Sequence, residues 1–288
     1  MNPVAMLKSL GFSKTVILDG KITAACDHPL IMALWYYEAE DNPNRGGAWI
    51  HPYYLASHQA YQAAKRFVAQ CEEAGIHASI RDDVLLKPIL AKLPGFSQGR
   101  NTLSYVEGAG SRFYVKLFEI DFPLENKVQP EEDVHPLHCG ACRRCMDACP
   151  TKAITEQGFI KERCVRFWMM PGKPVPEAIR SAMGNRLIGC DECQRCCPHN
   201  PAISAKAGEC IPLADMLQHP KETAEMLRER IGANLALPNR VLAQVCMLAG
   251  CSGDEGLLPL LEKLASHPSQ AVAEHASWAA RHLKNIPK

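Results

Sequence analysis

Four cysteines in the middle of the chain have the spacing that holds iron–sulfur clusters. They form a C-x2-C-x2-C-x3-C-P run made of Cys139, Cys142, Cys145 and Cys149, which Pro150 follows. In two-cluster ferredoxins the first three cysteines of such a run bind one cubane, and the fourth binds the other cluster. Further along the chain lie Cys190, Cys193 and Cys197, and Pro198 follows the last of them. The pattern predicts two 4Fe-4S clusters and a role in electron transfer.

The second set of cysteines lacks one ligand. Counted backwards from Cys197, the regular spacing places Leu187 where a fourth cysteine is expected. Another cysteine must complete the cluster, and Cys164 is the best candidate because Cys196 adjoins a residue that is already assigned. Exchange of one ligand between the sets then gives two groups. Cluster one takes Cys139, Cys142, Cys145 and Cys197, and cluster two takes Cys149, Cys164, Cys190 and Cys193.

Structural zinc is the main alternative to the clusters. Cys139 and Cys142 together with Cys190 and Cys193 would make an ordinary tetrahedral four-cysteine site. That site leaves four more regularly spaced cysteines unused. Disulfides are not expected, because the start of the chain carries no export signal and cytosolic thiols are kept reduced.

Composition indicates an ordinary globular protein. Of its 288 residues, 47% are apolar and 22% are charged, which excludes a disordered chain. The formal net charge of +1 argues against indiscriminate binding to nucleic acid, although a local basic face stays possible. The longest apolar stretches are far shorter than a membrane span. We therefore expect a cytoplasmic monomer with no membrane partner.

Three segments are predicted, and together they indicate an α+β fold. Residues 1–130 mix strands at 15–18, 78–80 and 111–118 with a helix over 56–74, which indicates an α/β domain. Residues 131–203 hold the cysteines, and turns around the clusters should replace regular structure there. Residues 204–288 are predicted to be helical, with two helices on either side of Pro268 that resemble a HEAT-type pair. One such pair cannot stand alone, so it should pack on the rest of the protein.

Two stretches around the cysteines resemble the epoxyqueuosine reductase family. Residues 184–194 have the sequence GNRLIGCDECQ and lead into CPHN at 197–200, and residues 149–154 have the sequence CPTKAI. The resemblance implies a cobalamin-dependent iron–sulfur oxidoreductase, related in architecture to reductive dehalogenases, that converts epoxyqueuosine in tRNA to queuosine. It also implies a shortened N-terminal α/β domain for cobalamin and substrate, a ferredoxin-like double 4Fe-4S domain and a C-terminal HEAT-like appendage.

Weaker resemblance extends upstream, over residues 99–103, 110–114 and 121–124. It implies that the cofactor is contacted by Arg100, Asn101, Gly110 and Ser111. Asp82 corresponds best to the catalytic acid of the family, and Asp83 is a neighbouring contender. Such an acid must hold a proton near neutral pH, which requires burial or a nearby negative charge. The chain departs from the family pattern at Lys116, where a small residue is usual, and at His199, which replaces a tryptophan.

The partners implied are tRNA and a ferredoxin or flavodoxin as electron donor. Basic residues crowd the cysteine segment and would hold tRNA phosphates if they share a face, or would dock an acidic donor. They are Arg143, Arg144, Lys152, Lys161, Arg163, Arg166, Lys173, Arg180, Arg186 and Arg195. Two other functions stay open. One is a corrinoid-dependent reductase or corrinoid-protein activator with another substrate, and the other is a non-catalytic 4Fe-4S electron-transfer protein.

Overall fold

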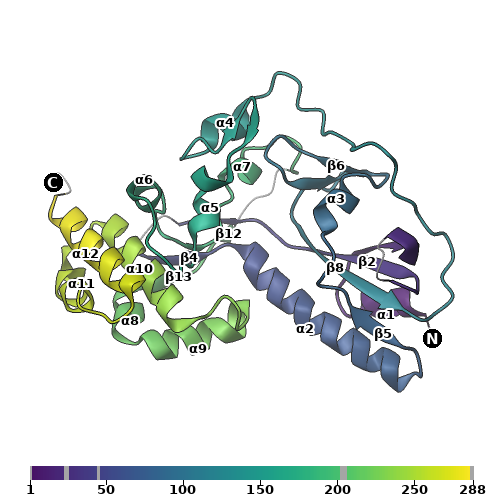
Figure 1. The fold of residues 1–288 in the computed structure, drawn as a ribbon, viewed down its shortest axis with the longest axis horizontal. Coiled ribbons are helices and arrows are strands. Elements are labelled where there is room, and N and C mark those ends of the chain that lie inside the picture. The colour runs from purple at the N-terminus through teal and green to yellow at the C-terminus, as the bar shows by residue number, and fades with distance from the viewer. Residues whose placement is uncertain (1, 23–25, 44–45, 202–205, 286–288) are drawn as a thin grey trace. The chain divides into compact units, whose positions relative to one another are not determined.

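The computed structural model describes residues 2–22, 26–43, 46–201 and 206–285 (Figure 1). It divides into two compact units, each built from separated parts of the chain. Unit one contains residues 1–38, 56–142 and 197–203, and unit two contains residues 39–55, 143–196 and 204–288. The short segment that carries Cys197 therefore folds with the N-terminal part of the chain. The three predicted segments stay a prediction, and their boundary at 203/204 lies outside the described residues.

Unit one is built on a four-stranded antiparallel sheet. Its strands lie in the order β1 (Lys14–Leu18), β2 (Leu30–Tyr36), β8 (Phe113–Ile120) and β5 (Ala78–Ile80), and each neighbouring pair is antiparallel. The predicted strands at 15–18 and 78–80 are confirmed, and the third begins two residues later than predicted. We expected an α/β arrangement here, but antiparallel pairing places this unit in the α+β class.

Alternating side chains bury both faces of this sheet. On one face, Ile31 and Ala33 pack against α1 (Pro3–Ser9) and against Ala60, Ala63, Ala64, Phe67 and Cys71 of α2 (Pro52–Glu73). On the other face, Leu30, Met32 and Leu34 pack against α3 (Leu86–Leu90) and the hairpin of β6 (Phe96–Gln98) and β7 (Ser104–Val106). The predicted helix over 56–74 is confirmed, and it begins earlier, at Pro52, a residue type favoured in the first turn.

Unit two begins with short strands that join distant parts of the chain. β4 (Gly47–Ile50) lies between β11 (Arg186–Ile188), which is parallel to it, and β13 (Cys210–Pro212), which is antiparallel. β3 (Glu40–Asp41) pairs with β12 (Lys206–Ala207). The cysteine-bearing part has only brief elements, as expected for a region organised around clusters. They are α4 (Arg144–Ala148), β9 (Ile154–Thr155), β10 (Gly158–Phe159), α5 (Val165–Trp168), α6 (Glu177–Ser181) and α7 (Glu192–Arg195).

The C-terminal part of unit two is helical. It contains α8 (Leu213–Gln218), α9 (Pro220–Ile231), α10 (Pro238–Ser252), α11 (Leu258–Leu264) and α12 (Gln270–Lys284), with a 3-10 turn at Glu255–Leu257. Other 3-10 turns lie at Gly20–Ile22 in unit one and at Lys161–Arg163 in the cysteine-bearing part. The break predicted at Pro268 is confirmed. A Cβ atom at Gly250 of α10 would lie 2.7 Å from Trp278 Cζ3, so α10 and α12 approach closely. Both helices share one core with Val175, Ile179 and Met183. Leu261 of α11 and Val272 of α12 belong to the same core, so the helical pair around Pro268 packs on the rest of the protein, as predicted.

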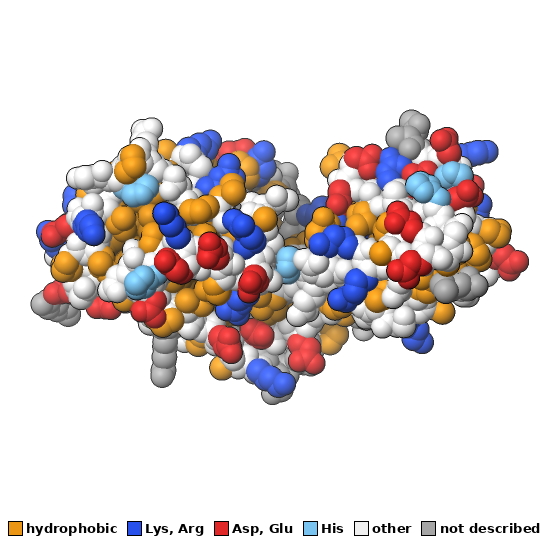
Figure 2. Space-filling model, turned by 90° about the horizontal axis from the view of Figure 1, so that it is seen from below, with side chains coloured by type: hydrophobic (Ala, Val, Ile, Leu, Met, Phe, Trp, Pro, Cys, Tyr) orange, Lys and Arg blue, Asp and Glu red, His pale blue; other side chains and the backbone are white. Residues whose placement is uncertain are grey.

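The molecular surface carries charges of both signs. Figure 2 shows basic and acidic side chains interspersed on the face that it presents, in keeping with the near-zero formal net charge. Across the part of the chain that the structure describes, no helix combines the length and apolar character required to cross a membrane.

Candidate metal centre

Five of the predicted cluster ligands gather in unit two. Cys193 lies close enough to Cys190, Cys164 and Cys149 for each of these sulfurs to act on it electrostatically, and Cys145 does so as well. Burial, followed by these neighbouring sulfurs, raises the pKa of the Cys193 thiol. Cys164, which precedes α5 and has no partner at a motif spacing, therefore lies in the same neighbourhood as the other thiols of predicted cluster two.

These thiols suit a positively charged iron core. Burial raises the pKa of the Cys190 thiol to about 11, because a thiolate without a counter-charge is poorly solvated there. Iron binds cysteine as thiolate and supplies that charge. Cys149 Sγ also accepts a hydrogen bond from the backbone amide of Ala153 at 3.2 Å. The donor set of cluster two therefore fits a 4Fe-4S cluster.

Three of the four predicted ligands of cluster one belong to unit one. The amide of Cys142 donates to the carbonyl oxygen of Cys139 at 2.9 Å, which closes the first turn of the ligand loop. Arg100 holds this loop from outside, because Nη1 donates to the carbonyl oxygen of Cys142 at 2.6 Å and Nη2 donates to that of Gly140 at 3.2 Å. Cys145, the fourth predicted ligand, follows three residues after Cys142 and is counted in unit two.

The loop that follows Cys197 is anchored on unit one by three side chains. Asn200 Oδ1 accepts hydrogen bonds from the amide and the hydroxyl of Ser111. Arg112 Nη1 donates to the carbonyl oxygen of Pro201 at 3.0 Å, and His199 Nε2 lies 3.3 Å from the carbonyl oxygen of His138. Cys197 is thus held in the same unit as Cys139 and Cys142, and its role as a ligand of cluster one stays a prediction.

The residues predicted to contact a cofactor make internal contacts around these same loops. Arg100 binds the Cys139–Cys142 turn, and Ser111 binds Asn200. Asn101 Nδ2 donates to the hydroxyl oxygen of Tyr105 at 2.9 Å. Gly110 has a φ of 78°, and a Cβ atom there would lie 2.4 Å from Asn200 Oδ1. These contacts are made within the protein itself, and the cofactor role of the four residues stays a prediction.

Asp82 and Asp83 have different partners. Asp82 is 63% exposed and forms an ion pair with Lys116, whose side chain is 5% exposed and lies over the Tyr61 ring. Asp83 accepts two hydrogen bonds from Arg81, at 2.9 and 2.7 Å, and these lower the pKa of the Asp83 carboxyl to about 2. Asp83 is therefore ionised near neutral pH and is unsuited to donate a proton.

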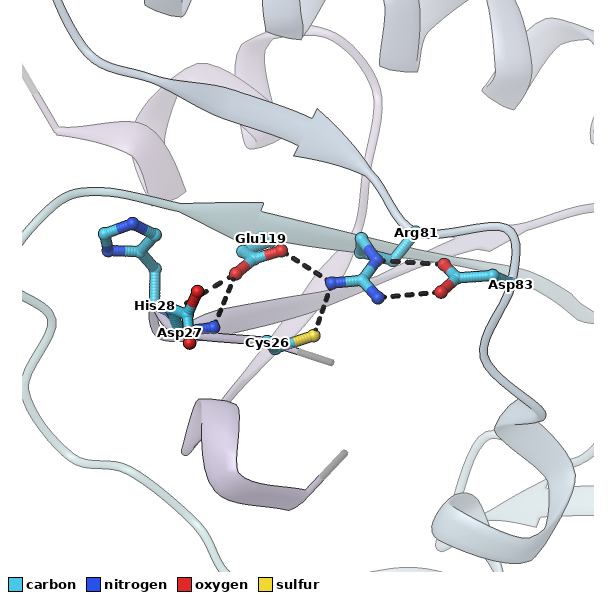
Figure 3. Close-up of polar contacts among 6 residues, drawn as sticks. All are labelled: Cys26, Asp27, His28, Arg81, Asp83 and Glu119. Atoms are coloured by element: carbon cyan, nitrogen blue, oxygen red, sulfur yellow. Dashed lines mark hydrogen bonds and ion pairs between the residues drawn. The ribbon is translucent and has the colours of Figure 1, made fainter. Parts of the chain in front are cut away.

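Arg81 is the centre of the network that holds Asp83 (Figure 3). Its Nη1 also donates to Glu119 Oε2 and lies by Cys26 Sγ, each at 2.6 Å. Glu119 in turn accepts from the amides of Asp27 and His28. Burial alone would raise the pKa of the Glu119 carboxyl, but Arg81 and the two amides lower it overall. The network fixes the end of β5 and so the start of the segment that carries Asp82.

Two aromatic residues near the predicted ligands were not anticipated as partners of the clusters. In unit one, burial and then the neighbouring Cys197 sulfur raise the pKa of the Tyr105 phenol. In unit two, Tyr54 accepts a hydrogen bond from Arg166 and lies within electrostatic reach of Cys164 and Cys190. Neither residue belongs to a sequence motif with the cysteines, because only the fold brings each ring close to the sulfurs. Only their aromatic character was visible in the sequence.

Over the described ranges, no group of three or more His, Cys, Asp or Glu side chains is arranged to hold a single metal ion. All fourteen cysteines lie in those ranges, and all of them are free thiols rather than disulfides.

Comparisons with known proteins agree with the cysteine pattern. Residues 138–200 match the family described as a 4Fe-4S double cluster binding domain. The epoxyqueuosine reductase of Xanthomonas campestris is 29% identical over 238 residues, which cover 78% of this chain and 66% of that protein. The enzyme of the same name from Pseudomonas aeruginosa is 31% identical over 76% of this chain and 63% of its own length. The chain is similar to the epoxyqueuosine reductases over about three-quarters of its length.

Solved structures extend the likeness to the fold. An epoxyqueuosine reductase of Bacillus subtilis superposes with a TM-score of 0.71 over 98% of this chain and 89% of that chain, at 18% sequence identity. An epoxyqueuosine reductase in complex with an epoxyqueuosine-modified tRNA stem loop gives a TM-score of 0.72 with the same coverage, at 17% identity. This chain therefore shares the mixed helical and stranded fold of the epoxyqueuosine reductases, while it spans slightly less than two-thirds of the length of the curated relatives named above.

Proposed function

We propose that this chain is an iron–sulfur oxidoreductase that reduces epoxyqueuosine in tRNA to queuosine. The observation that carries the proposal is the joint match of one chain to a double 4Fe-4S domain and to proteins named epoxyqueuosine reductase over about three-quarters of its length. The match in fold to a reductase solved with an epoxyqueuosine-modified stem loop supports tRNA as the substrate.

The reaction needs two electrons and two protons, which remove the epoxide oxygen as water. We infer that a ferredoxin or flavodoxin delivers the electrons singly, and that the thiolates assigned to clusters one and two hold the relay. Arg100 and Asn200 keep the ligand loops of cluster one in place. A fixed ligand shell limits the rearrangement that accompanies each electron transfer, and this is what the protein contributes to cofactor chemistry.

Cobalamin is the further cofactor that the family implies. When bound, it would supply a cobalt centre that transfers the electrons to the epoxide. Arg100, Asn101 and Ser111 make contacts within the protein. Cobalamin binding by this chain is therefore inferred from the likeness to the family, and the proposed function depends mainly on the two clusters.

We propose Asp82 as the proton donor. The side chain is mostly exposed and lies beyond the end of β5, where a bound substrate can reach it. Asp82 is paired with Lys116, so contact with a substrate requires that this ion pair open. The Bacillus subtilis structure with its catalytic loop swung out of the active site shows that such a loop moves in a relative.

The test uses protein purified without oxygen and tRNA that contains epoxyqueuosine. We expect stoichiometric iron and sulfide, and conversion of the nucleoside to queuosine with a reduced donor. Asp82→Asn should abolish turnover and leave the iron content unchanged, whereas Asp83→Asn, its matched neighbour, should retain turnover. Full activity of Asp82→Asn would remove Asp82 from the acid role, and absence of sulfide would overturn the proposal itself.

A second candidate is a 4Fe-4S electron-transfer protein without substrate chemistry of its own. The four residues predicted to contact a cofactor make hydrogen bonds or close contacts within the protein, and this favours the second candidate. This candidate predicts full clusters, no binding of added cobalamin and no turnover of the tRNA. Bound corrin without turnover would instead indicate a corrinoid-dependent reductase with another substrate.

A further inference from the structure

Two aromatic rings lie at the surface beside a predicted ligand of cluster two. Phe167 on α5 is 43% exposed, and Trp168 next to it is partly exposed. The two rings meet edge-on, with centroids 5.3 Å apart. The Phe167 amide donates to the carbonyl oxygen of Cys164 at 3.0 Å, so the rings belong to the loop that carries this ligand. Exposed aromatic rings in mutual contact form an apolar patch of the kind that marks an interaction site.

A lysine lies over each of these rings. Lys161 Nζ is 4.8 Å from the centroid of the Phe167 ring, and Lys173 Nζ is 5.1 Å from that of the Trp168 ring. Both lysines are exposed. These four side chains are here called the aromatic-basic face. They lie in residues 158–173, which contain four basic residues and one acidic residue in a chain whose formal net charge is +1. The local excess of positive charge suits an acidic partner.

Two short hydrogen-bonded routes lead from this face to sulfurs assigned to cluster two. The amide of Cys164 donates to the carbonyl oxygen of Lys161 at 3.0 Å. On the other side, the amide of Ile160 donates to the carbonyl oxygen of Ala153 at 2.8 Å, and the amide of Ala153 donates to Cys149 Sγ at 3.2 Å. All of these residues belong to unit two. A carrier seated on the aromatic-basic face would therefore lie next to the ligands of cluster two.

We propose that the aromatic-basic face docks an acidic one-electron carrier protein, which delivers its electron to cluster two. The inference rests on the proposed function, because it requires the clusters. In each transfer the carrier is oxidised by one electron, the cluster is reduced by one, and no bond forms or breaks. Aromatic side chains supply the apolar centre of a protein interface, and the surrounding lysines steer a partner of opposite charge. Transient redox complexes need only a small contact area.

The geometry favours a protein over a nucleic acid as the occupant. Bases bind single-strand platforms by stacking on aromatic rings. Lys161 and Lys173 already lie over the rings of Phe167 and Trp168, so one side of each ring is covered. A carrier protein needs no stacking position, because it contacts ring edges and the ammonium groups.

The experiment measures the binding of flavodoxin, an acidic carrier, to the anaerobically purified full chain. Lys161→Glu combined with Lys173→Glu reverses the charge of the face. We expect the affinity for flavodoxin at low ionic strength to fall by about tenfold or more, with unchanged iron content. Added salt should weaken binding by the unaltered chain. If the reversed variant loses iron, Lys161→Gln combined with Lys173→Gln is measured in its place and should weaken binding in the same direction.

The matched control is Lys221→Glu combined with Lys263→Glu. These lysines are exposed on α9 and α11 of the same unit, so the control has the same net charge as the reversed variant. It should bind flavodoxin as the unaltered chain does.

A second variant identifies the cluster that receives the electron. Cys193→Ala removes a predicted ligand of cluster two and no residue of the aromatic-basic face. It should bind flavodoxin normally, but rapid mixing with reduced flavodoxin should no longer give the fast phase of iron–sulfur reduction that the unaltered chain shows.

Each outcome decides a specific point. Equal affinity of the reversed variant and the unaltered chain for flavodoxin overturns the inference and leaves the proposed function intact. Equal weakening in the control shows that net charge decides binding, and this also overturns it. Weaker binding of a tRNA stem loop with unchanged flavodoxin binding would assign the face to nucleic acid. A fast phase retained in Cys193→Ala contradicts cluster two as the acceptor. Absence of iron and sulfide from the unaltered protein instead removes the proposed function.

Discussion

The amide oxygen of Asn200 accepts two hydrogen bonds from Ser111, one from the backbone nitrogen at 2.7 Å and one from the hydroxyl at 3.0 Å. Both residues are buried, and they lie 89 positions apart in the chain. The pair joins the loop after Cys197 to the start of the segment that leads into β8. Because Cys197 lies three residues before Asn200, the contact decides where this ligand is held.

Asn200→Ala should loosen the Cys197 loop. The substitution leaves two buried donors of Ser111 without their acceptor, which should lower the free energy of unfolding by about 1–3 kcal/mol. We also expect partial loss of iron from cluster one. Denaturant unfolding and iron analysis measure the two effects. Asn200→Asp keeps an acceptor oxygen and serves as the control, and equal iron retention in both variants would contradict the anchoring role.

Cys164→Ala should remove cluster two. If Cys164 completes this cluster, the variant should contain about half of the iron and sulfide of the unaltered protein, because one of two four-iron clusters is lost. Cys196→Ala removes a thiol that adjoins Cys197 but is not assigned as a ligand, so it should retain the full content. The opposite result, with iron lost from Cys196→Ala alone, would exchange the roles of the two cysteines.

Arg81→Met should destabilise unit one. The variant leaves the Glu119 carboxylate, which is 16% exposed, without its cationic partner, and removes the contacts to Asp83. We expect a loss of about 2–3 kcal/mol in the free energy of unfolding. Arg81→Lys keeps the charge but not the forked geometry, so it should be intermediate. Unfolding midpoints that coincide for all three proteins would show that the network adds no stability.

His275 should make the protein less stable in mild acid. Burial, and then the nearby Arg180, lower the pKa of His275 to about 4, and Nε2 accepts a hydrogen bond from the amide of Val175 at 3.0 Å. An unfolded histidine titrates at about 6.5. Between these values the unfolded state binds a proton that the folded state does not, so stability is full above pH 6.5 and falls toward pH 4, by about 3 kcal/mol.

Denaturant unfolding between pH 7.5 and 4.5 tests this dependence. His275→Gln retains an acceptor without a titrating group, so its stability should fall less steeply over the interval than that of the unaltered protein. If the free energy of unfolding falls with pH at the same slope in both proteins, the role assigned to His275 is wrong.

Much of the candidate site was predictable because its signals are local. The cysteine run from Cys139 to Cys149 places ligands on successive turns, and its spacing alone indicates clusters. The helix after Pro52 and the helices on either side of Pro268 were also predicted, since apolar periodicity is a property of contiguous residues. The prediction of an α/β class for the first segment was wrong, since its sheet is antiparallel. The direction in which strands pair depends on contacts between distant segments, which local sequence patterns do not show.

The sequence by itself determined the chemistry: thiolates in cluster spacing and a likeness to the epoxyqueuosine reductases. Tertiary structure alone decided which distant groups meet. It brings Cys164 to Cys193, holds Cys197 in the unit of Cys139, and sets Tyr105 beside Cys197. The physical reason is that ligand identity and spacing are encoded residue by residue. The partners of a buried sulfur or phenol are instead selected by packing and hydrogen bonding between segments that are far apart in the chain.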